Sequence, residues 1–277
     1  MEAGSCVVQA LTLLALVALL HYLTTTLRHR HRLHKHRYPP GPKPWPIIGN
    51  LNLIGLREAD EGSAKEIQQD PIIGGTETSV STLEWVICEL LKQPQLLQRA
   101  TEELDRVVGR DRLVEEDDIP NLPYICAIVK ETMRLHPGGT LLAPHLSTED
   151  CKIAGYDIPK GTIVLVNAWG IGRDPRYWEA SEKFMPERFF GNNIDVIGHH
   201  FELLPFGSGR RMCPGYRLAL IMVQSTLANL VHGFSWKLPD NMKPEDVEME
   251  EEFAQATHKK IPLAVVVEPR LSAHLYA

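Results

Sequence analysis

One cysteine lies in a setting suited to binding a metal ion. Cys213 follows a glycine-rich loop with two adjacent arginines and precedes a run, Tyr216 to His232, that reads as a helix. Nearby cations and the positive end of a helix dipole both stabilise a thiolate. A thiolate is an axial ligand of iron in proteins, so the segment predicts an iron site. The alternative is a buried cysteine in a turn.

The residues around Cys213 also suit a flat macrocycle. Gly209 and Gly215 have no Cβ, so the backbone can approach a planar group closely. Arg211 can pair with a carboxylate such as a haem propionate. The pattern Phe206-x-x-Gly209-x-Arg211-x-Cys213-x-Gly215 resembles the haem-thiolate loop of the cytochromes P450. The resemblance implies haem b as cofactor, with Cys213 as the iron ligand and the other four residues binding the cofactor around it.

A second segment places an acid beside an alcohol. A helix is predicted from its cap, Asp70, to about Lys92, and its first turns contain the run Gly74–Ser79. Taken alone, this run is a helix start that two glycines weaken. Gly-Gly-x-Glu-Thr-Ser also resembles the oxygen-activation motif of the P450 family. The resemblance implies that Glu77 and Thr78 are catalytic, holding water and relaying protons to bound dioxygen. The family's central helix begins well before this point.

A third motif predicts an ion pair. Glu131 and Arg134 lie three residues apart in a predicted helix, Tyr124–Leu135, so they share a face and can pair. An exposed pair of this kind would contribute little to stability. Glu-x-x-Arg before Leu-His-Pro resembles the ExxR motif of the P450 family, and Phe184–Phe189 resembles its FxPERF loop. The resemblance implies a buried structural triad completed by Arg188.

Three β segments are predicted around these motifs. Gly138–His145 would line the pocket beside the haem, where two glycines replace bulkier residues and loosen the pocket edge. His145 is predicted to contact the cofactor, in place of the arginine that relatives usually carry for a propionate. Histidine is shorter and mostly neutral at pH 7, which weakens this anchor. Ile153–Val166 is predicted as a hairpin and His258–Pro269 as a last β segment.

The N-terminal sequence predicts a membrane anchor. Val7–Leu27 is almost wholly apolar and long enough to span a bilayer; a cleaved signal peptide is the alternative. The basic run Arg28–Arg37 predicts that the remainder faces the cytosol, and its histidines either bind metal or belong to a solvated flank. Tyr38–Asn50 contains five prolines, which favour a stiff spacer or a polyproline ligand. It resembles the hinge of microsomal P450s.

Only the polar segment Leu51–Gln69 connects this hinge to the central helix, where the family has a long run of helices and strands. A splice product and a mis-assembled gene model both explain this. The predicted organisation is an anchor with its basic flank (1–37), a hinge with a shortened linker (38–69), and the C-terminal part of a haem domain (70–277). The predicted fold is mainly α with small β-sheets, a truncated P450-type fold behind a transmembrane helix.

Composition limits the partners. The 277 residues carry a net charge of −6, with no basic run beyond the N-terminus, which argues against nucleic-acid binding. The five cysteines match no disulfide or zinc pattern and fit a reducing compartment.

The resemblance therefore implies a haem-thiolate monooxygenase of the plant microsomal type, similar to flavonoid 3'-hydroxylases. It would be a single-pass protein of the endoplasmic reticulum membrane that acts on a small hydrophobic metabolite. The chain has no Gly-x-Gly-x-x-Gly fingerprint, so NADPH–cytochrome P450 reductase is the expected electron donor. Two alternatives remain. One is an inactive, membrane-anchored remnant that lost too much of its core. The other is an isomerase or dehydratase, which the Glu77–Thr78 pair disfavours.

Overall fold

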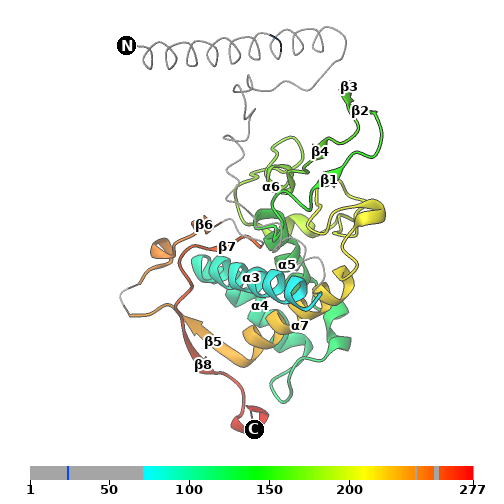
Figure 1. Ribbon diagram of the computed structural model, residues 1–277. Helices are drawn as coiled ribbons and strands as arrows, with labels where there is room; N and C mark the ends of the chain where they lie inside the picture. The colour runs from blue at the N-terminus through cyan, green and yellow to red at the C-terminus, as the bar shows by residue number, and fades with distance from the viewer. Residues whose placement is uncertain (1–23, 25–70, 241, 253–255, 277) are drawn as a thin grey trace, which may run out of the picture. The chain divides into compact units, whose positions relative to one another are not determined.

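A computed structural model describes Thr24 and residues 71–240, 242–252 and 256–276. Contacts divide the chain into two units (Figure 1). The smaller includes His145–Val164; the larger comprises Lys65–Pro144 and Leu165–Ala277. Apart from Thr24, the predicted anchor and hinge lie outside the described residues. Within the described ranges, no helix is long and apolar enough to cross a bilayer.

Helices are the main regular secondary structure of the larger unit. They are α3 (Pro71–Lys92), α4 (Pro94–Val107), α5 (Pro123–Leu135), α6 (Ala168–Gly172) and α7 (Tyr216–Gly233). Proline begins α3, α4 and α5, where its missing N–H has no partner to lose. The three helices predicted from the sequence are confirmed, with both ends within one residue of the predicted ones.

The core of the larger unit lies between α3, α4, α5 and α7, which cluster in Figure 1. Leu90, Leu104, Ile125 and Leu227, one from each helix, are fully buried. Burying a leucine or isoleucine side chain stabilises a fold by about 1.5–3 kcal/mol. Apolar contact between the four helices is therefore the main force that positions α3 and α5, which carry predicted site residues.

A buried carboxylate fixes the start of α5. Glu103 of α4 is 7% exposed and accepts hydrogen bonds from the backbone N–H groups of Tyr124 (2.9 Å) and Ile125 (3.0 Å). The first N–H groups of a helix have no partner inside the helix, and the helix dipole favours negative charge there. Glu103 thus caps α5 from a neighbouring helix.

Two antiparallel pairs of strands complete the larger unit. β5 (Phe234–Lys237) pairs with β8 (Val266–Pro269), and β6 (Glu251–Glu252) pairs with β7 (His258–Lys259). The single last β segment predicted over 258–269 is therefore wrong, because its two ends belong to different sheets. Pro262 lies between them and has no N–H to donate to a ladder.

The smaller unit contains β1 (His145–Leu146) paired with β4 (Ile163–Val164), and β2 (Cys151–Ile153) paired with β3 (Tyr156–Ile158). The predicted hairpin over 153–166 is shifted. The real hairpin is β2–β3, and its turn consists of Ala154 (φ 49°) and Gly155 (φ 84°). Two successive positive φ values match the twist of a two-residue hairpin.

The strand predicted over Gly138–His145 is also mostly wrong. Of these residues only His145 lies in a strand, and 138–144 form turns in the larger unit. Leu142 has φ 51°, which is incompatible with an extended strand.

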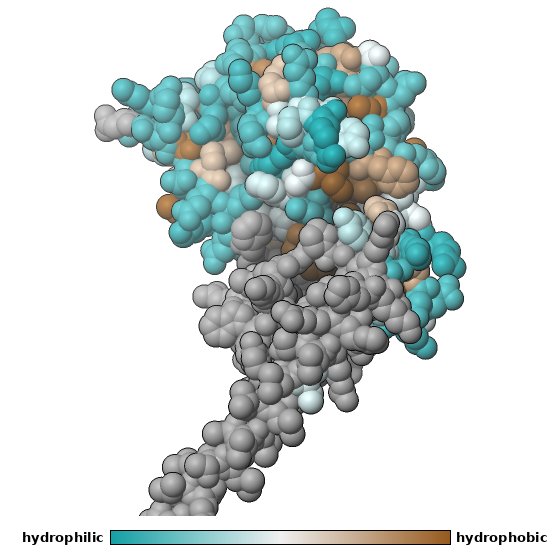
Figure 2. Space-filling view, turned by 90° about the horizontal axis from the view of Figure 1, so that it is seen from above, coloured by the Kyte–Doolittle hydropathy of each residue, from teal (hydrophilic) through white to brown (hydrophobic). Residues whose placement is uncertain are grey.

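Short 3₁₀ helices fill several connections. They are η2 (Glu116–Asn121), η3 (Pro186–Phe189), η4 (Gly209–Arg211), η5 (Pro244–Asp246) and η6 (Ala273–Tyr276). η3 and η4 contain two of the predicted site arginines, Arg188 and Arg211. Most coloured residues in the space-filling view of Figure 2 are hydrophilic, with small apolar areas between them.

Candidate functional site

The Cys213 loop is closed by its own backbone. The N–H of Cys213 donates to the carbonyl oxygen of Phe206 at 2.9 Å. Gly207 (φ 73°) and Gly209 (φ 71°) lie within the loop in the left-handed region, where a Cβ would be strained. The loop therefore needs glycine to bring residue 213 back over residue 206, directly before α7.

The sulfur of this loop is accessible. Cys213 is exposed and free, and Gly215, at the cap of α7, is exposed beside it. A Cβ added at Gly215 would meet only the Cys213 Sγ, at 3.9 Å. The Phe206 ring lies 6.3 Å from that of Tyr216 and packs against the core, which ties the loop to the helix bundle. Cys213 is therefore not a buried cysteine in a turn, which was the alternative interpretation of its sequence.

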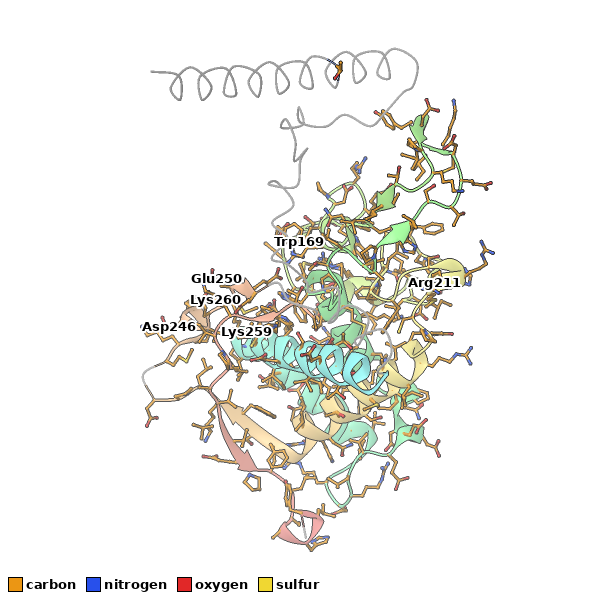
Figure 3. All side chains as sticks on the ribbon, in the orientation of Figure 1. Trp169, Arg211, Asp246, Glu250, Lys259 and Lys260 are labelled. Atoms are coloured by element: carbon orange, nitrogen blue, oxygen red, sulfur yellow. The ribbon has the colours of Figure 1, made fainter. Side chains whose placement is uncertain are left out.

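The Arg211 side chain of this loop is available for a ligand. Arg211 is exposed, and within the described residues its guanidinium forms neither an ion pair nor a hydrogen bond (Figure 3). A guanidinium suits carboxylates because it donates two parallel hydrogen bonds.

The other described thiols differ from Cys213. Burial raises the pKa of the Cys88 thiol to about 12 and that of the Cys126 thiol to about 11. Both thiols therefore stay protonated at neutral pH. Cys151 is exposed but belongs to the smaller unit.

The acid–alcohol pair lies near the start of α3. Glu77 is exposed, and Thr78 is half-buried with its hydroxyl donating to the Gly74 carbonyl at 2.8 Å. A Cβ added at Gly138 would lie 3.6 Å from the Thr78 Cβ, so the backbone after α5 packs against this threonine. Gly138 therefore leaves room next to Thr78 that a larger residue would occupy.

Gly138–Leu142, which we call the bridging segment, contacts both parts of the site. Its first residue lies against Thr78, and the Leu142 Cδ1 lies 3.7 Å from where a Gly207 Cβ would be. The Thr257 N–H donates to the Gly138 carbonyl at 3.0 Å. The carbonyl of Thr257 accepts in turn from Ser81 Oγ at 2.6 Å, which holds the segment to α3. Sequence reasoning missed this arrangement, because Thr257 is more than 100 residues from both partners.

The structure brings the three predicted triad residues together. Glu131 and Arg134 are both fully buried at the side chain, and Arg134 donates to both Glu131 carboxylate oxygens at 2.8 Å. Arg188 Nε donates to Glu131 Oε1 at 3.0 Å, and its side chain is 9% exposed. The Met185 N–H adds a fourth hydrogen bond to Glu131, at 2.7 Å.

Every N–H of Arg134 has an acceptor. Besides Glu131, the guanidinium donates to the backbone carbonyls of Gly172, Ser181 and Lys183. Gly172 approaches α5 so closely that an added Cβ would overlap the Arg134 carbonyl oxygen, so only glycine fits there. The triad therefore joins α5, α6 and the loop before η3 into one support.

His145 lies in the smaller unit, at the start of β1, where it is exposed and pairs across to Val164. Its predicted contact with a cofactor stays a prediction.

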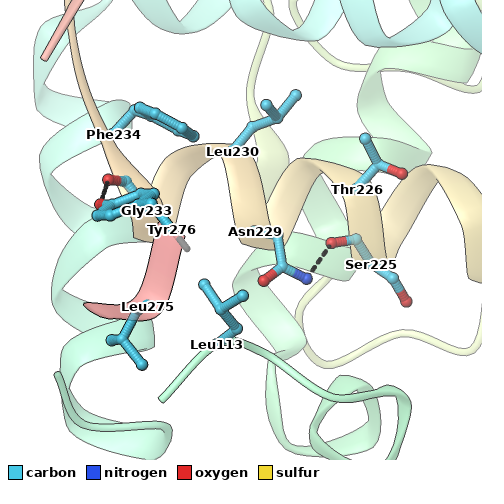
Figure 4. A pocket seen from close by; sticks show the side chains of 9 residues that line it. All are labelled: Leu113, Ser225, Thr226, Asn229, Leu230, Gly233, Phe234, Leu275 and Tyr276. Atoms are coloured by element: carbon cyan, nitrogen blue, oxygen red, sulfur yellow. Dashed lines mark hydrogen bonds between the residues drawn. The ribbon is translucent and has the colours of Figure 1, made fainter. Parts of the chain in front are cut away.

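A pocket of about 380 Å³ lies elsewhere in the larger unit (Figure 4). Ser225, Thr226, Asn229 and Leu230 of α7 line it together with residues near the C-terminus. Ser225 is nine residues along the helix from Tyr216, which is about 14 Å at 1.5 Å per residue. The pocket is thus separate from the Cys213 loop.

Comparisons with known proteins identify the family. The family model described as "Cytochrome P450" matches residues 58–263. The chain is 58% identical to the trimethyltridecatetraene synthase of Zea mays over 76% of its own length and 39% of the relative's. It is 49% identical to a flavonoid 3',5'-hydroxylase of Campanula medium, over 82% of the chain and 42% of the relative. The chain belongs to the cytochrome P450 family.

Solved structures support the same family assignment. A zebra fish cytochrome P450 in a structure with abiraterone matches with a TM-score of 0.64 and 36% identity, over 71% of this chain and 46% of that one. The chain spans less than half the length of each of these relatives. The P450 family uses a haem iron with a cysteine thiolate ligand, and the plant relatives place this chain among plant P450s.

The described residues fit the thiolate side of such a haem. Cys213 presents a free, exposed sulfur, and the Gly215 side of that sulfur is open. Arg211, two residues away, supplies a cation that has no partner among the described residues and is suited to a propionate. The donor set of the Cys213 loop is therefore chemically suited to the family's cofactor.

Proposed function

We propose that the chain is a haem-thiolate monooxygenase of plant metabolism that inserts one atom of dioxygen into a small organic molecule. The observation that carries this proposal is the Cys213 loop, with its exposed free thiol between a left-handed glycine turn and the start of α7. In the P450 family, bound haem supplies the activation of dioxygen.

The chain's own residues have distinct tasks in this proposal. Cys213 binds the iron as a thiolate, and Arg211 holds a carboxylate of the macrocycle through charge-assisted hydrogen bonds. Phe206, Gly209 and Gly215 shape the loop around them. Glu131, Arg134 and Arg188 support the loop from behind and touch neither substrate nor cofactor. His145 is proposed as a second, weaker contact to the cofactor.

Thr78 and Glu77 are proposed to deliver protons. The Thr78 hydroxyl donates to the Gly74 carbonyl, so its oxygen lone pairs can accept a hydrogen bond from water. The exposed Glu77 can exchange protons with solvent from the adjacent position.

The remaining partners follow from the class. Electrons would come from NADPH through a cytochrome P450 reductase, at the endoplasmic reticulum membrane. The relatives named flavonoid 3',5'-hydroxylase and trimethyltridecatetraene synthase favour a small hydrophobic plant metabolite as substrate.

The test is turnover under ¹⁸O₂. The haem-supplemented full chain, a reductase and NADPH are incubated with flavonoids and with terpenoid alcohols, and products are analysed by mass spectrometry. One ¹⁸O atom per product molecule is the expected result. NADPH-independent product without ¹⁸O would contradict the monooxygenase reaction, and the absence of any product would favour a non-enzymatic role.

A further inference from the structure

A buried histidine at the end of α5 lies between two acids. His136 is 7% exposed, and its ring stacks on that of Trp85, with centroids 4.1 Å apart and planes 2° from parallel. Its Nε2 lies 2.9 Å from Glu89 Oε1 of α3, and its Nδ1 lies 3.2 Å from Glu251 Oε1 of β6. In the sequence, His136 belongs to the Leu-His-Pro motif, which predicts neither of these partners.

Counting donors shows which form of this histidine would satisfy both acids. A neutral imidazole has one N–H donor, whereas an ionised carboxylate only accepts. Two carboxylates at hydrogen-bond distance therefore require a doubly protonated ring, unless one carboxylate is itself protonated. Nearby donors keep Glu251 ionised: Trp169 Nε1 donates to its second oxygen at 3.1 Å (Trp169 is labelled in Figure 3), and Arg173 Nη2 lies 3.7 Å from Oε1.

The cluster then balances its charge. With His136 doubly protonated, the two positive charges of His136 and Arg173 would offset the two carboxylates of Glu89 and Glu251. The indole face of Trp85 also attracts a cation stacked on it. The outer charged neighbours are Lys259 of β7, 5.5 Å from the Trp85 ring centroid, and Glu182, 3.4 Å from Arg173.

The cluster lies between the end of α5 and the start of the bridging segment. His136 is two residues before Gly138, which packs against Thr78. Trp85, on which His136 stacks, donates to the Thr257 carbonyl at 3.3 Å, and Thr257 donates to the Gly138 carbonyl. The stacked pair of His136 and Trp85 therefore holds the end of α5 directly. Through Thr257, Trp85 is also connected to Gly138, which packs against Thr78.

We propose that His136 is a positioning residue, an imidazolium that ties α5 to α3 and β6 and thereby fixes the bridging segment between Thr78 and the Cys213 loop. Its importance for oxygen activation rests on the proposed function. The clamp itself does not, because it consists only of residues of this chain.

The test reads the ring protons directly. The full chain with ¹⁵N-labelled histidine is examined by NMR at pH 7 without haem, and the His136 signal is assigned by its loss in His136→Phe. The expected signal has both ring nitrogens protonated. His136→Phe keeps the ring stack but removes both donors. The Glu89 and Glu251 carboxylates would then lack the hydrogen bonds from His136, which should speed amide hydrogen exchange at Thr257 roughly tenfold to a hundredfold.

A matched control is His274→Phe, because His274 is exposed and its side chain has no hydrogen bond within the described residues. It should leave exchange at Thr257 unchanged. If His136→Phe does not fold, Glu251→Gln is used instead. It keeps the shape of the Glu251 side chain and is expected to speed amide exchange at Thr257. A single ring N–H on His136, or exchange at Thr257 equal to wild type in the folded variant, would overturn the proposal. Neither readout needs haem, so failure of the monooxygenase proposal is a separate result.

Discussion

Glu131→Gln tests how far the buried triad holds the larger unit together. The variant keeps the shape of Glu131 but replaces one carboxylate oxygen with an N–H donor. Arg134 is fully buried, so its charge would lose its only carboxylate partner among the described residues. Four hydrogen bonds to Glu131 would be weakened or broken.

The expected cost is large relative to the stability of a domain. Removing one partner of a buried ion pair typically costs about 3–5 kcal/mol, because the other charge remains buried. Whole domains are stable by only about 5–15 kcal/mol. The three carbonyls that also accept from Arg134 keep its N–H groups partly bonded, so we expect about 3 kcal/mol, at the lower end of the range.

Urea unfolding followed by circular dichroism measures this difference. Glu268→Gln is the matched control, since Glu268 pairs with Lys237 at 2.7 Å and both side chains are more than half exposed. The control should cost less than about 1 kcal/mol. If Glu131→Gln costs no more than the control, the triad does not stabilise the larger unit.

Three further predictions concern the acid–alcohol pair, the half-buried acid Glu251 and the thiols. Thr78→Ala should retain the thiolate spectrum but yield less product per electron; an unchanged yield would exclude a proton relay by Thr78. Burial alone would raise the pKa of Glu251, but hydrogen bonds from His136 and Trp169 and the nearby Arg173 charge hold that pKa below its usual value. Glu251→Gln should therefore destabilise the chain by about 1–2 kcal/mol at neutral pH. This difference should disappear as the pH falls from 4.5 through the lower pKa of the folded state; a difference that grows in acid would refute it. In native thiol labelling with iodoacetamide at pH 8, Cys213 should react well before Cys88, whose thiol pKa is raised to about 12 by burial; equal rates would contradict the burial of Cys88.

Local signals in the sequence predicted the helices well. The starts of α3 and α5 are marked by proline, and their lengths follow from the spacing of apolar residues. Both signals depend only on neighbouring residues. Short motifs likewise singled out Glu131, Arg134 and Arg188, which the structure brings together.

Strand pairing was predicted less well, because it depends on partners far along the chain. β8 pairs with β5, some thirty residues earlier, and β4 pairs with β1 rather than with its neighbour β3. The left-handed Leu142 interrupts an apolar run that the sequence presents as a strand.

The His136 cluster was missed for a similar reason. Its two carboxylates lie 47 and 115 residues away, so no local pattern connects them. The one available signal is a histidine directly after a buried helix end, where an ionisable group needs partners.

The proposed function depends above all on Cys213 binding haem iron as a thiolate. The most direct measurement is the ferrous carbon monoxide difference spectrum of the purified, haem-supplemented chain, beside Cys213→Ala and the control Cys126→Ala. We expect the strongly red-shifted Soret band of a thiolate-ligated haem in the wild type and in Cys126→Ala, and its loss in Cys213→Ala. The same band in Cys213→Ala, or no such band in the wild type, would contradict it.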